Sequence, residues 1–132
     1  MVQGIGIDLV DLVEFRRLCD DCRDPSAPEA NAFVRHTFSE AERRQAAGRH
    51  DPMEYLAGRF AVKEAVLKAV VHLMTPDGFD MRLITSLDDA NGRPYVVMEG
   101  RLAEILVQAG VSDVQISISN ENEYVVAIAL AQ

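Results

Sequence analysis

A long helix signal in the middle of the chain limits the possible folds more than any other feature. Asp51-Pro52 combines an N-cap residue with a proline at the first helical position, and Glu54 follows in the first turn. From there the sequence predicts one helix to about His72, ended by Thr75-Pro-Asp-Gly78. This is the longest predicted element, and the rest of the fold has to be arranged around it.

The segments on either side predict strands and shorter helices. Residues 2–7 predict a short buried strand that ends at Asp8, and an amphipathic helix follows with Leu9, Leu12, Val13, Phe15 and Leu18 as its apolar set. Strands and helices in this order predict an α+β fold, with helices packed on a mainly antiparallel sheet. The other predicted elements are a short helix over 29–35, a helix from a capping box at Ser39 to Gly48, strands over 81–87 and 95–98 around the turn Asn91-Gly92, a helix over 102–109 closed by Gly110, and strands over 114–119 and 124–130.

Composition narrows the class of protein. With 132 residues, 48% of them hydrophobic, the chain is expected to form a single domain over 1–132. A formal net charge of −8 argues against a nucleic-acid binder. No stretch approaches the roughly 20 apolar residues of a membrane span, and the N-terminus lacks the pattern of a signal peptide. We therefore expect a soluble cytoplasmic protein with no nucleic-acid or membrane partner.

The chain has only two lysines, Lys63 and Lys68, and both lie on the predicted long helix. Every other cation is arginine, which cannot replace lysine where a compact ammonium group is needed. Ala57, Ala61, Glu64 and Lys68 follow spacings of four, three and four residues, so they share one stripe of the helix. Taken alone, Glu64 and Lys68 would form an ordinary ion pair on a solvated face.

Asp8 suggests a second carboxylate close to this stripe. Gly4 and Gly6 precede it, and glycines allow a backbone or ligand to approach closely. The alternative is a tight entry into the next helix, with Asp8 or Asp11 as the N-cap. Asp8 and Glu64 together would form a sparse oxygen site suited to magnesium, which completes its shell with water and substrate phosphate. A nearby lysine would then contact the phosphates.

Five motifs occur in order along the chain: Gly4-Ile-Gly-Ile-Asp8, Phe38-Ser-Glu-Ala-Glu42, Tyr55-Leu-Ala-Gly-Arg-Phe-Ala-Val-Lys-Glu-Ala-Val-Leu-Lys68, Asn91-Gly-Arg-Pro94 and Ile116-Ser-Ile-Ser119. With them, nearly the whole chain resembles the phosphopantetheinyl transferases, specifically the small holo-acyl-carrier-protein synthase type. The aspartate motif is weak by itself, but it is specific in combination with the helix motif.

The resemblance implies transfer of the phosphopantetheine arm of coenzyme A to a serine of an apo acyl carrier protein, with release of adenosine 3′,5′-bisphosphate. The serine would lose its proton to a metal-bound water or a carboxylate and attack the β-phosphorus. A homotrimer with each site shared between two neighbours is also implied. By position, the catalytic residues would be Asp8, Glu64 and Lys68, with Asp8 and Glu64 as magnesium ligands, and the coenzyme site would include Lys68, Lys63, Arg59, Gly92, Pro94 and Asn120, with the Gly92–Pro94 turn near the adenine.

The sequence departs from the family pattern around this site. Lys68 is followed by Ala-Val-Val-His-Leu-Met, where the family usually has Ala-x-Gly-Thr-Gly. Asn120 stands in place of the usual histidine, and an asparagine can donate a hydrogen bond but carries no charge. The segment 74–81 is apolar and unlike the family.

The expected partner surface also differs. The first helix has Glu14 where the family typically has a basic residue, and carrier proteins are acidic. Partner binding would then depend on Arg16, Arg17 and Arg23, with Arg35, Arg43, Arg44 and Arg49 as further candidates for this face or for the coenzyme 3′-phosphate.

Three functions stay open at this point. An active magnesium-dependent transferase is favoured by the Asp8, Glu64 and Lys68 set. A divergent, weakly active or inactive relative that binds coenzyme A or a carrier protein as an assembly subunit is favoured by the missing glycines and Asn120. A metal-dependent phosphohydrolase, with water in place of the serine, is the third. The carrier protein, of fatty acid or polyketide synthesis, is not specified by the sequence.

Overall fold

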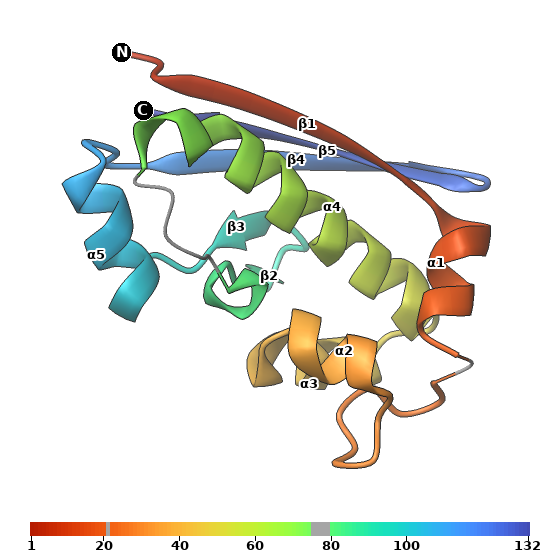
Figure 1. The fold of residues 1–132 in the computed structure, drawn as a ribbon. Coiled ribbons are helices and arrows are strands. Elements are labelled where there is room, and N and C mark those ends of the chain that lie inside the picture. The colour runs from red at the N-terminus through yellow and green to blue at the C-terminus, as the bar shows by residue number, and fades with distance from the viewer. Residues whose placement is uncertain (21, 75–79) are drawn as a thin grey trace.

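A three-stranded antiparallel sheet forms one layer of the fold. The structure is a computed structural model that describes every residue except 21 and 75–79. The strand order is β1–β5–β4, made by β1 (Gly4–Asp11), β5 (Tyr124–Ala131) and β4 (Val114–Glu121). The long helix α4 (Pro52–Val70) packs along one face of this sheet (Figure 1). The predicted α+β class with one long central helix is confirmed.

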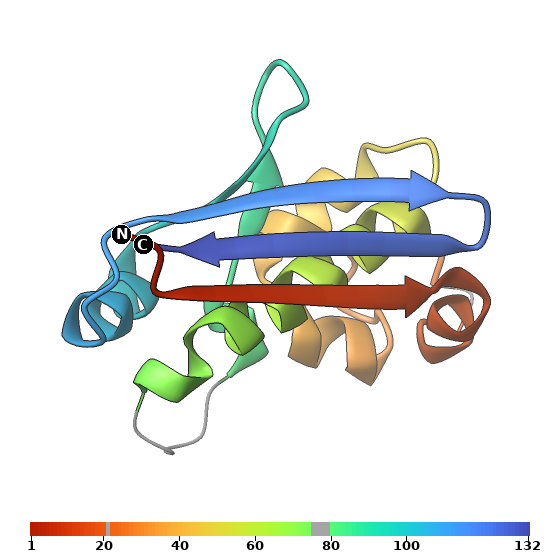
Figure 2. The same cartoon turned by 90° about the horizontal axis from the view of Figure 1, so that it is seen from above.

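The shorter elements lie beside and below α4 in Figure 1, away from the sheet, and Figure 2 shows from above how the three strands lie over α4. None of the helices in the described ranges is long and apolar enough to cross a membrane. These elements are α1 (Leu12–Leu18), α2 (Ala32–Thr37), α3 (Glu40–Ala47), the 3-10 turns η1 (Val71–Leu73) and η2 (Met81–Leu83), the antiparallel strands β2 (Ser86–Asp88) and β3 (Pro94–Val96), and α5 (Gly100–Gln108).

The start of α4 follows its local sequence. The Asp51 side chain accepts a hydrogen bond from the Glu54 amide, and Pro52 occupies the first turn, as predicted. The helix ends at Val70 and continues as the 3-10 turn η1, so the predicted end at about His72 is two residues late. The predicted stop at Thr75-Pro-Asp-Gly78 lies outside the described residues.

Two glycines bring β1 into backbone contact with α4. A Cβ atom added at Gly4 would lie 1.8 Å from the carbonyl oxygen of Ala69, and one added at Gly6 would lie 1.8 Å from that of Ala65. Any side chain at either position would therefore separate strand from helix. The predicted close approach is confirmed, and the approaching backbone is that of α4. Asp8 is two residues further along β1, so it lies on the same face of the strand.

The predicted end of β1 at Asp8 is wrong. All eight residues of β1 pair with β5, as far as the Asp11–Tyr124 pair. The alternation continues past Asp8, because Val10 is buried whereas Leu9 is 63% exposed on the outer face. Leu9 therefore belongs to the strand and not to the following helix. Asp11 is the N-cap of α1 and accepts from the amides of Val13 and Glu14.

The strand predicted over 81–87 is also wrong in its first half. Asp80 accepts the Arg82 amide at 2.9 Å, and this local bond favours the 3-10 turn over a strand. The hairpin turn is confirmed, with Gly92 at φ +81°. The remaining elements differ from their predicted bounds by a few residues: α2 begins at Ala32, α5 begins at Gly100, β3 covers only Pro94–Val96, and β4 extends to Glu121.

A buried ion pair joins α4 to α3. The Lys63 side chain is fully buried, its Nζ lies 2.6 Å from Glu42 Oε1, and it also donates to the carbonyl oxygens of Met81 and Ile84. Glu42 closes the predicted capping box with Ser39 and accepts the Ser86 amide at 3.1 Å. Burial lowers the pKa of Lys63, and the adjacent Glu42 carboxylate opposes that shift.

Replacing Lys63 by methionine is expected to destabilise the fold by about 3–5 kcal/mol, because it leaves the Glu42 carboxylate buried without a partner charge. The measurement is urea unfolding followed by circular dichroism. The double variant Lys63→Met with Glu42→Gln should recover part of the loss, since it removes the unpaired charge.

Arg44→Met is the matched control, because it breaks the Arg44–Glu40 ion pair, in which both side chains are largely exposed. Its expected cost is below about 0.5 kcal/mol. Equal effects of Lys63→Met and Arg44→Met would contradict the structural role assigned to Lys63.

Candidate active site

The structure brings Asp8, Glu64 and Lys68 together where β1 crosses α4. Lys68 Nζ lies 3.2 Å from Asp8 Oδ1 and donates to the carbonyl oxygen of Ile7 at 3.0 Å. The Asp8 side chain is 16% exposed, whereas that of Lys68 is 54% exposed. Glu64 is half-buried on α4. Two residues from one helix and one from the first strand thus form a cluster at the surface.

The electrostatics of this cluster suit a cation. The pKa of Glu64 is raised, first by burial and then by the negative charge of Asp8, while Lys68 opposes the shift. The two carboxylates therefore repel each other in a partly buried place, and a divalent ion would relieve that repulsion. Within the described ranges no group of three or more His, Cys, Asp or Glu side chains gathers as a metal site. Two carboxylates alone fit magnesium, which takes most of its ligands from water and phosphate.

A hollow of about 250 Å³ lies beside this cluster, between β1, α1 and α4. Asp8 and Glu64 contribute to its lining together with the acidic side chains of Asp11 and Glu14. The rest of the lining is mainly apolar and comes from Leu9, Val10, Phe15, Leu18 and Phe60. We call this space the carboxylate hollow.

Four residues predicted to bind coenzyme line a second hollow, of about 210 Å³. They are Arg59 from α4, Gly92 and Pro94 from the hairpin, and Asn120 from β4. We call this space the coenzyme hollow. It shares no lining residue with the carboxylate hollow. Within one chain, the predicted metal ligands Asp8 and Glu64 thus lie at one hollow, and these four predicted coenzyme-binding residues lie at another.

Arg59 lines the coenzyme hollow and has two buried hydrogen-bond donors without a partner in the described part of the chain. The residue is only 4% exposed, and its Nη2 atom lies 3.0 Å from Asp88 Oδ1. Its guanidinium also lies 4.5 Å from the centre of the Tyr55 ring. The Nε and Nη1 atoms have no hydrogen-bond partner among the described residues. Because buried unpaired donors are costly, this edge of Arg59 is suited to an anionic ligand.

Asn120 is already engaged in the coenzyme hollow. Its Nδ2 atom donates to Glu54 Oε1 at 2.6 Å. The residue pairs with the buried Val125 in the sheet, so it faces α4. A phosphate oxygen would have to compete with Glu54 for this donor.

Lys63 does not lie at either hollow. The predicted contact of Lys63 with coenzyme disagrees with the structure, in which the side chain is fully buried against Glu42. Lys63 and Lys68 are five residues apart, which places them about 140° apart around the helix. One therefore points into the core while the other reaches the surface.

The predicted partner-binding arginines do not form one free basic face. Arg16 forms two hydrogen bonds to Asp51, at 3.1 and 2.7 Å, and Arg17 pairs with Glu14 at 3.0 Å. Arg23 is exposed. Glu14, which replaces the basic residue of the family, thus neutralises the charge of Arg17 within the same helix.

Sequence reasoning missed Asp88 and Tyr55 at the coenzyme hollow, whereas Arg49 was among the further candidates for the 3′-phosphate. Asp88 pairs with both Arg59 and Arg49, and Arg49 lies 5.0 Å from the Tyr55 ring. The i,i+4 spacing of Tyr55 and Arg59 could have indicated a stacked pair on the helix. Nothing local in the sequence links either residue to Asp88, which comes from β2.

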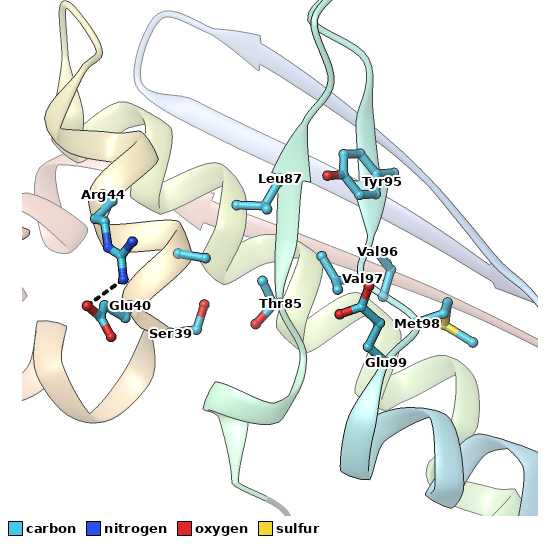
Figure 3. A pocket seen from close by; sticks show the side chains of 11 residues that line it. Ser39, Glu40, Arg44, Thr85, Leu87, Tyr95, Val96, Val97, Met98 and Glu99 are labelled. Carbon is cyan, nitrogen blue, oxygen red and sulfur yellow. Dashed lines mark hydrogen bonds and ion pairs between the residues drawn. The ribbon is translucent and has the colours of Figure 1, made fainter.

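A larger, shallow hollow of about 800 Å³ lies elsewhere, between α3 and the β2–β3 hairpin (Figure 3). The side chains of Leu87, Tyr95 and Met98 line one side, and the Glu40–Arg44 ion pair lies on the other. Of the residues named as site candidates from the sequence, only Arg44 lines this hollow, and it is paired with Glu40.

Comparisons with known proteins find similar sequences and structures along nearly the whole chain. The family model described as the 4′-phosphopantetheinyl transferase superfamily matches residues 4–129. A holo-[acyl-carrier-protein] synthase of Caldicellulosiruptor saccharolyticus is 31% identical over 100% of this chain and 98% of its own length. The crystal structure of holo-[acyl-carrier-protein] synthase from Neisseria meningitidis has a TM-score of 0.83 and 32% identity, and the match covers 100% of this chain and 99% of that one. A Chronobacterium ammoniagenes synthase in complex with coenzyme A has a TM-score of 0.74 and 32% identity, with 98% of this chain and 96% of that one covered.

The Arg16–Asp51 pair gives a prediction that depends on pH. Arg16→Gln should destabilise the fold by about 0.5–1 kcal/mol near neutral pH, whereas Arg17→Gln, whose pair is more exposed, should cost less than about 0.5 kcal/mol. The hydrogen bond from Arg16 lowers the pKa of Asp51. A lowered carboxyl pKa contributes stability above the unfolded-state pKa, and this contribution is lost as pH falls through the folded-state pKa.

The difference between wild type and Arg16→Gln should therefore shrink only as pH falls below about 5, first through the ordinary aspartate pKa of the unfolded chain and then through the lower folded-state pKa of Asp51. Urea unfolding at several pH values measures it. A difference that is constant with pH would contradict the assigned ion pair.

Proposed function

The chain belongs to the 4′-phosphopantetheinyl transferase superfamily, and on that premise we propose how its site works. It is an enzyme of the holo-acyl-carrier-protein synthase type, and it transfers phosphopantetheine from coenzyme A to an apo acyl carrier protein. The residues of the site, the metal ion, the second product and the oligomeric state are the parts that we propose. The location of the protein in the cytoplasm is still a prediction from the sequence.

We propose that Asp8 and Glu64 bind Mg²⁺ and that Lys68 contacts a phosphate of the coenzyme. The single observation that carries this assignment is the contact of β1 with α4, which brings two partly buried carboxylates next to one exposed ammonium group. When bound, the ion would neutralise the charge that develops on the diphosphate. Asp8 and Glu64 would orient it, and Lys68 would exchange its contact with Asp8 for one with phosphate.

The acceptor serine of the carrier protein would enter the carboxylate hollow and attack the β-phosphorus of coenzyme A. The serine hydroxyl would give its proton to one of the carboxylates or to water, its oxygen would take the phosphopantetheine group, and the bond to adenosine 3′,5′-bisphosphate would break so that this product leaves. The glycines of the family pattern fall at Val71 and Leu73 in this chain, and both residues lie in the 3-10 turn η1 after α4. Because side chains at these positions hinder close approach of the backbone to a phosphate, the Lys68 side chain would supply the contact that a glycine-rich backbone supplies in the family.

The adenosine end of the coenzyme would occupy the coenzyme hollow. The resemblance implies that the Gly92–Pro94 turn lies near the adenine, and Arg59 lines the same space with two unpaired donors. The coenzyme phosphate closest to the adenine is the 3′-phosphate on the ribose. Arg59 would bind that group, and Asn120 would contribute only if it releases Glu54.

A homotrimer with sites shared between neighbours is the proposed assembly. The outer face of β1 and β5 carries exposed apolar side chains, which is unusual for a monomer. Hollows of about 210 and 250 Å³ are too small to enclose a molecule as large as coenzyme A. Pairing the carboxylate hollow of one subunit with the coenzyme hollow of the next in a closed ring would make a larger site. The exposed apolar side chains of this face are Ile5, Ile7, Leu9, Tyr124 and Ile128.

Transfer is measured by incubating the protein with coenzyme A, Mg²⁺ and apo carrier proteins of fatty acid and polyketide synthesis, followed by mass spectrometry of the carrier. Wild type should add one phosphopantetheine group and release adenosine 3′,5′-bisphosphate. Glu64→Gln should reduce the rate by about 100-fold or more, because it removes a metal ligand without changing the shape of the side chain.

Glu104→Gln is the control, since Glu104 pairs with Arg101 on the exposed face of α5 and should have no effect on transfer. Full activity of Glu64→Gln would contradict the metal assignment. Coenzyme binding without any gain in carrier mass would instead favour the binding or assembly subunit. Release of the bisphosphate without carrier modification would favour a phosphohydrolase.

Subunit mixing tests the shared site. Asp8→Ala and Arg59→Ala should each be nearly inactive alone, because each removes one half of every site. In mixed trimers about one quarter of the sites would combine an intact carboxylate hollow with an intact coenzyme hollow, as expected for random association in a ring. Size-exclusion chromatography with light scattering checks that trimers form.

Asp8→Ala mixed with Glu64→Ala is the matched control, because both residues line the same hollow and cannot restore each other. If the first mixture stays as inactive as this control, each site lies within one subunit.

A further inference from the structure

One carboxylate, Asp88, joins the two arginines next to the coenzyme hollow. Its Oδ1 atom lies 3.0 Å from Arg59 Nη2, and its Oδ2 atom lies 3.2 Å from Arg49 Nη2. Both guanidinium groups also lie over the ring of Tyr55, at 4.5 Å for Arg59 and 5.0 Å for Arg49. Asp88 itself is only 13% exposed, so water screens these charges weakly.

The backbone of Asp88 is held in place by Gln45 on α3. The Asp88 amide donates to Gln45 Oε1 at 2.8 Å, and Gln45 Nε2 donates to the Asp88 carbonyl oxygen at 3.1 Å. The Tyr55 hydroxyl donates to the same Gln45 oxygen. These bonds fix the ring and the carboxylate relative to each other. Asp88 therefore holds Arg59 as part of a connected network that includes three secondary structure elements.

The network affects how strongly Arg59 attracts an anion. Asp88 occupies the Nη2 end of the guanidinium, while Nε and Nη1 have no partner among the described residues. Among the charged residues that line the coenzyme hollow, Asp88 and Glu54 are negative and Arg59 is positive. An anion bound in the coenzyme hollow beside Arg59 thus meets a cation whose charge is already balanced by a carboxylate.

We propose that Asp88 is a specificity-determining residue, which acts through Arg59 to limit the preference of this enzyme for a coenzyme that carries the 3′-phosphate. The proposal rests on the proposed function, because it places the adenosine end of coenzyme A in the coenzyme hollow. Asp88 is an internal counter-anion: it positions Arg59 and competes for its charge. Arg49 weakens this competition, because its own ion pair with Asp88 balances part of the negative charge of that carboxylate.

The test compares coenzyme A with dephospho-coenzyme A, which differs only in lacking the 3′-phosphate. Isothermal titration calorimetry on the full-length protein, without carrier protein, gives the two dissociation constants and their ratio. Asp88→Asn keeps an oxygen that can accept from Arg59 but removes the negative charge. It should raise the preference for coenzyme A by about tenfold, the effect of roughly one charge-assisted interaction.

Arg49→Gln should change the ratio in the opposite direction, because the whole Asp88 charge then acts on Arg59. This variant also keeps the proposal testable if Asp88→Asn does not fold, since the Arg49 side chain is 40% exposed. Glu104→Gln alters the net charge by the same amount as Asp88→Asn, in an ion pair on α5, and should leave the ratio unchanged. Thermal unfolding of each variant confirms that it is folded.

A role in folding alone would move both dissociation constants together and leave their ratio unchanged. That result, or a fall in the preference for coenzyme A in Asp88→Asn, would overturn the proposal while leaving the proposed function intact. If wild type binds neither form of the coenzyme, the proposal and the proposed coenzyme site fail together.

Discussion

The backbone contact between β1 and α4 is the constraint on which the rest of the structure depends. Gly4 and Gly6 place the strand directly against the carbonyl oxygens of Ala69 and Ala65, with no side chain between them. Because side chains on one face of a strand are two residues apart, the same contact leaves Asp8 next to Glu64 and Lys68. A larger residue at either glycine would move the strand away from the helix and separate the carboxylates. The proposed catalytic cluster is therefore a consequence of how the core packs.

The two lysines show how one helix serves both stability and chemistry. Lys63 lies in the core, where Glu42 and two backbone carbonyl groups satisfy its ammonium group. Lys68 reaches the surface and contacts Asp8. The buried pair also ties α3 and β2 to α4, because Glu42 accepts the Ser86 amide. The Lys63 network thus supports the side of α4 opposite the sheet, while the glycines fix the side that faces it.

Local signals in the sequence predicted local structure well. The N-cap at Asp51, the capping box at Ser39 and the turn at Gly92 each depend on neighbouring residues, and all three are present. The predicted length of β1 was wrong because the observed length depends on pairing with β5, which lies more than a hundred residues away in the sequence. The predicted cluster of Asp8, Glu64 and Lys68 is present although the predicted end of the strand was wrong. That prediction came from the spacing along the helix and from the family resemblance, and neither depends on where β1 ends. Lys63 and Asp88 could not be predicted, since their partners come from other elements.

The charge of the chain makes the placement of its few cations important. Coenzyme A carries several phosphate charges and carrier proteins are acidic, whereas this chain has a formal net charge of −8. Long-range electrostatic repulsion therefore opposes binding, and attraction has to come from single groups close to each phosphate. Lys68 and a metal ion would supply it at the carboxylate hollow, and Arg59 at the coenzyme hollow. Asp88 balances part of the positive charge of Arg59. The diphosphate of coenzyme A, at the carboxylate hollow, should therefore contribute more of the binding energy than the adenosine end.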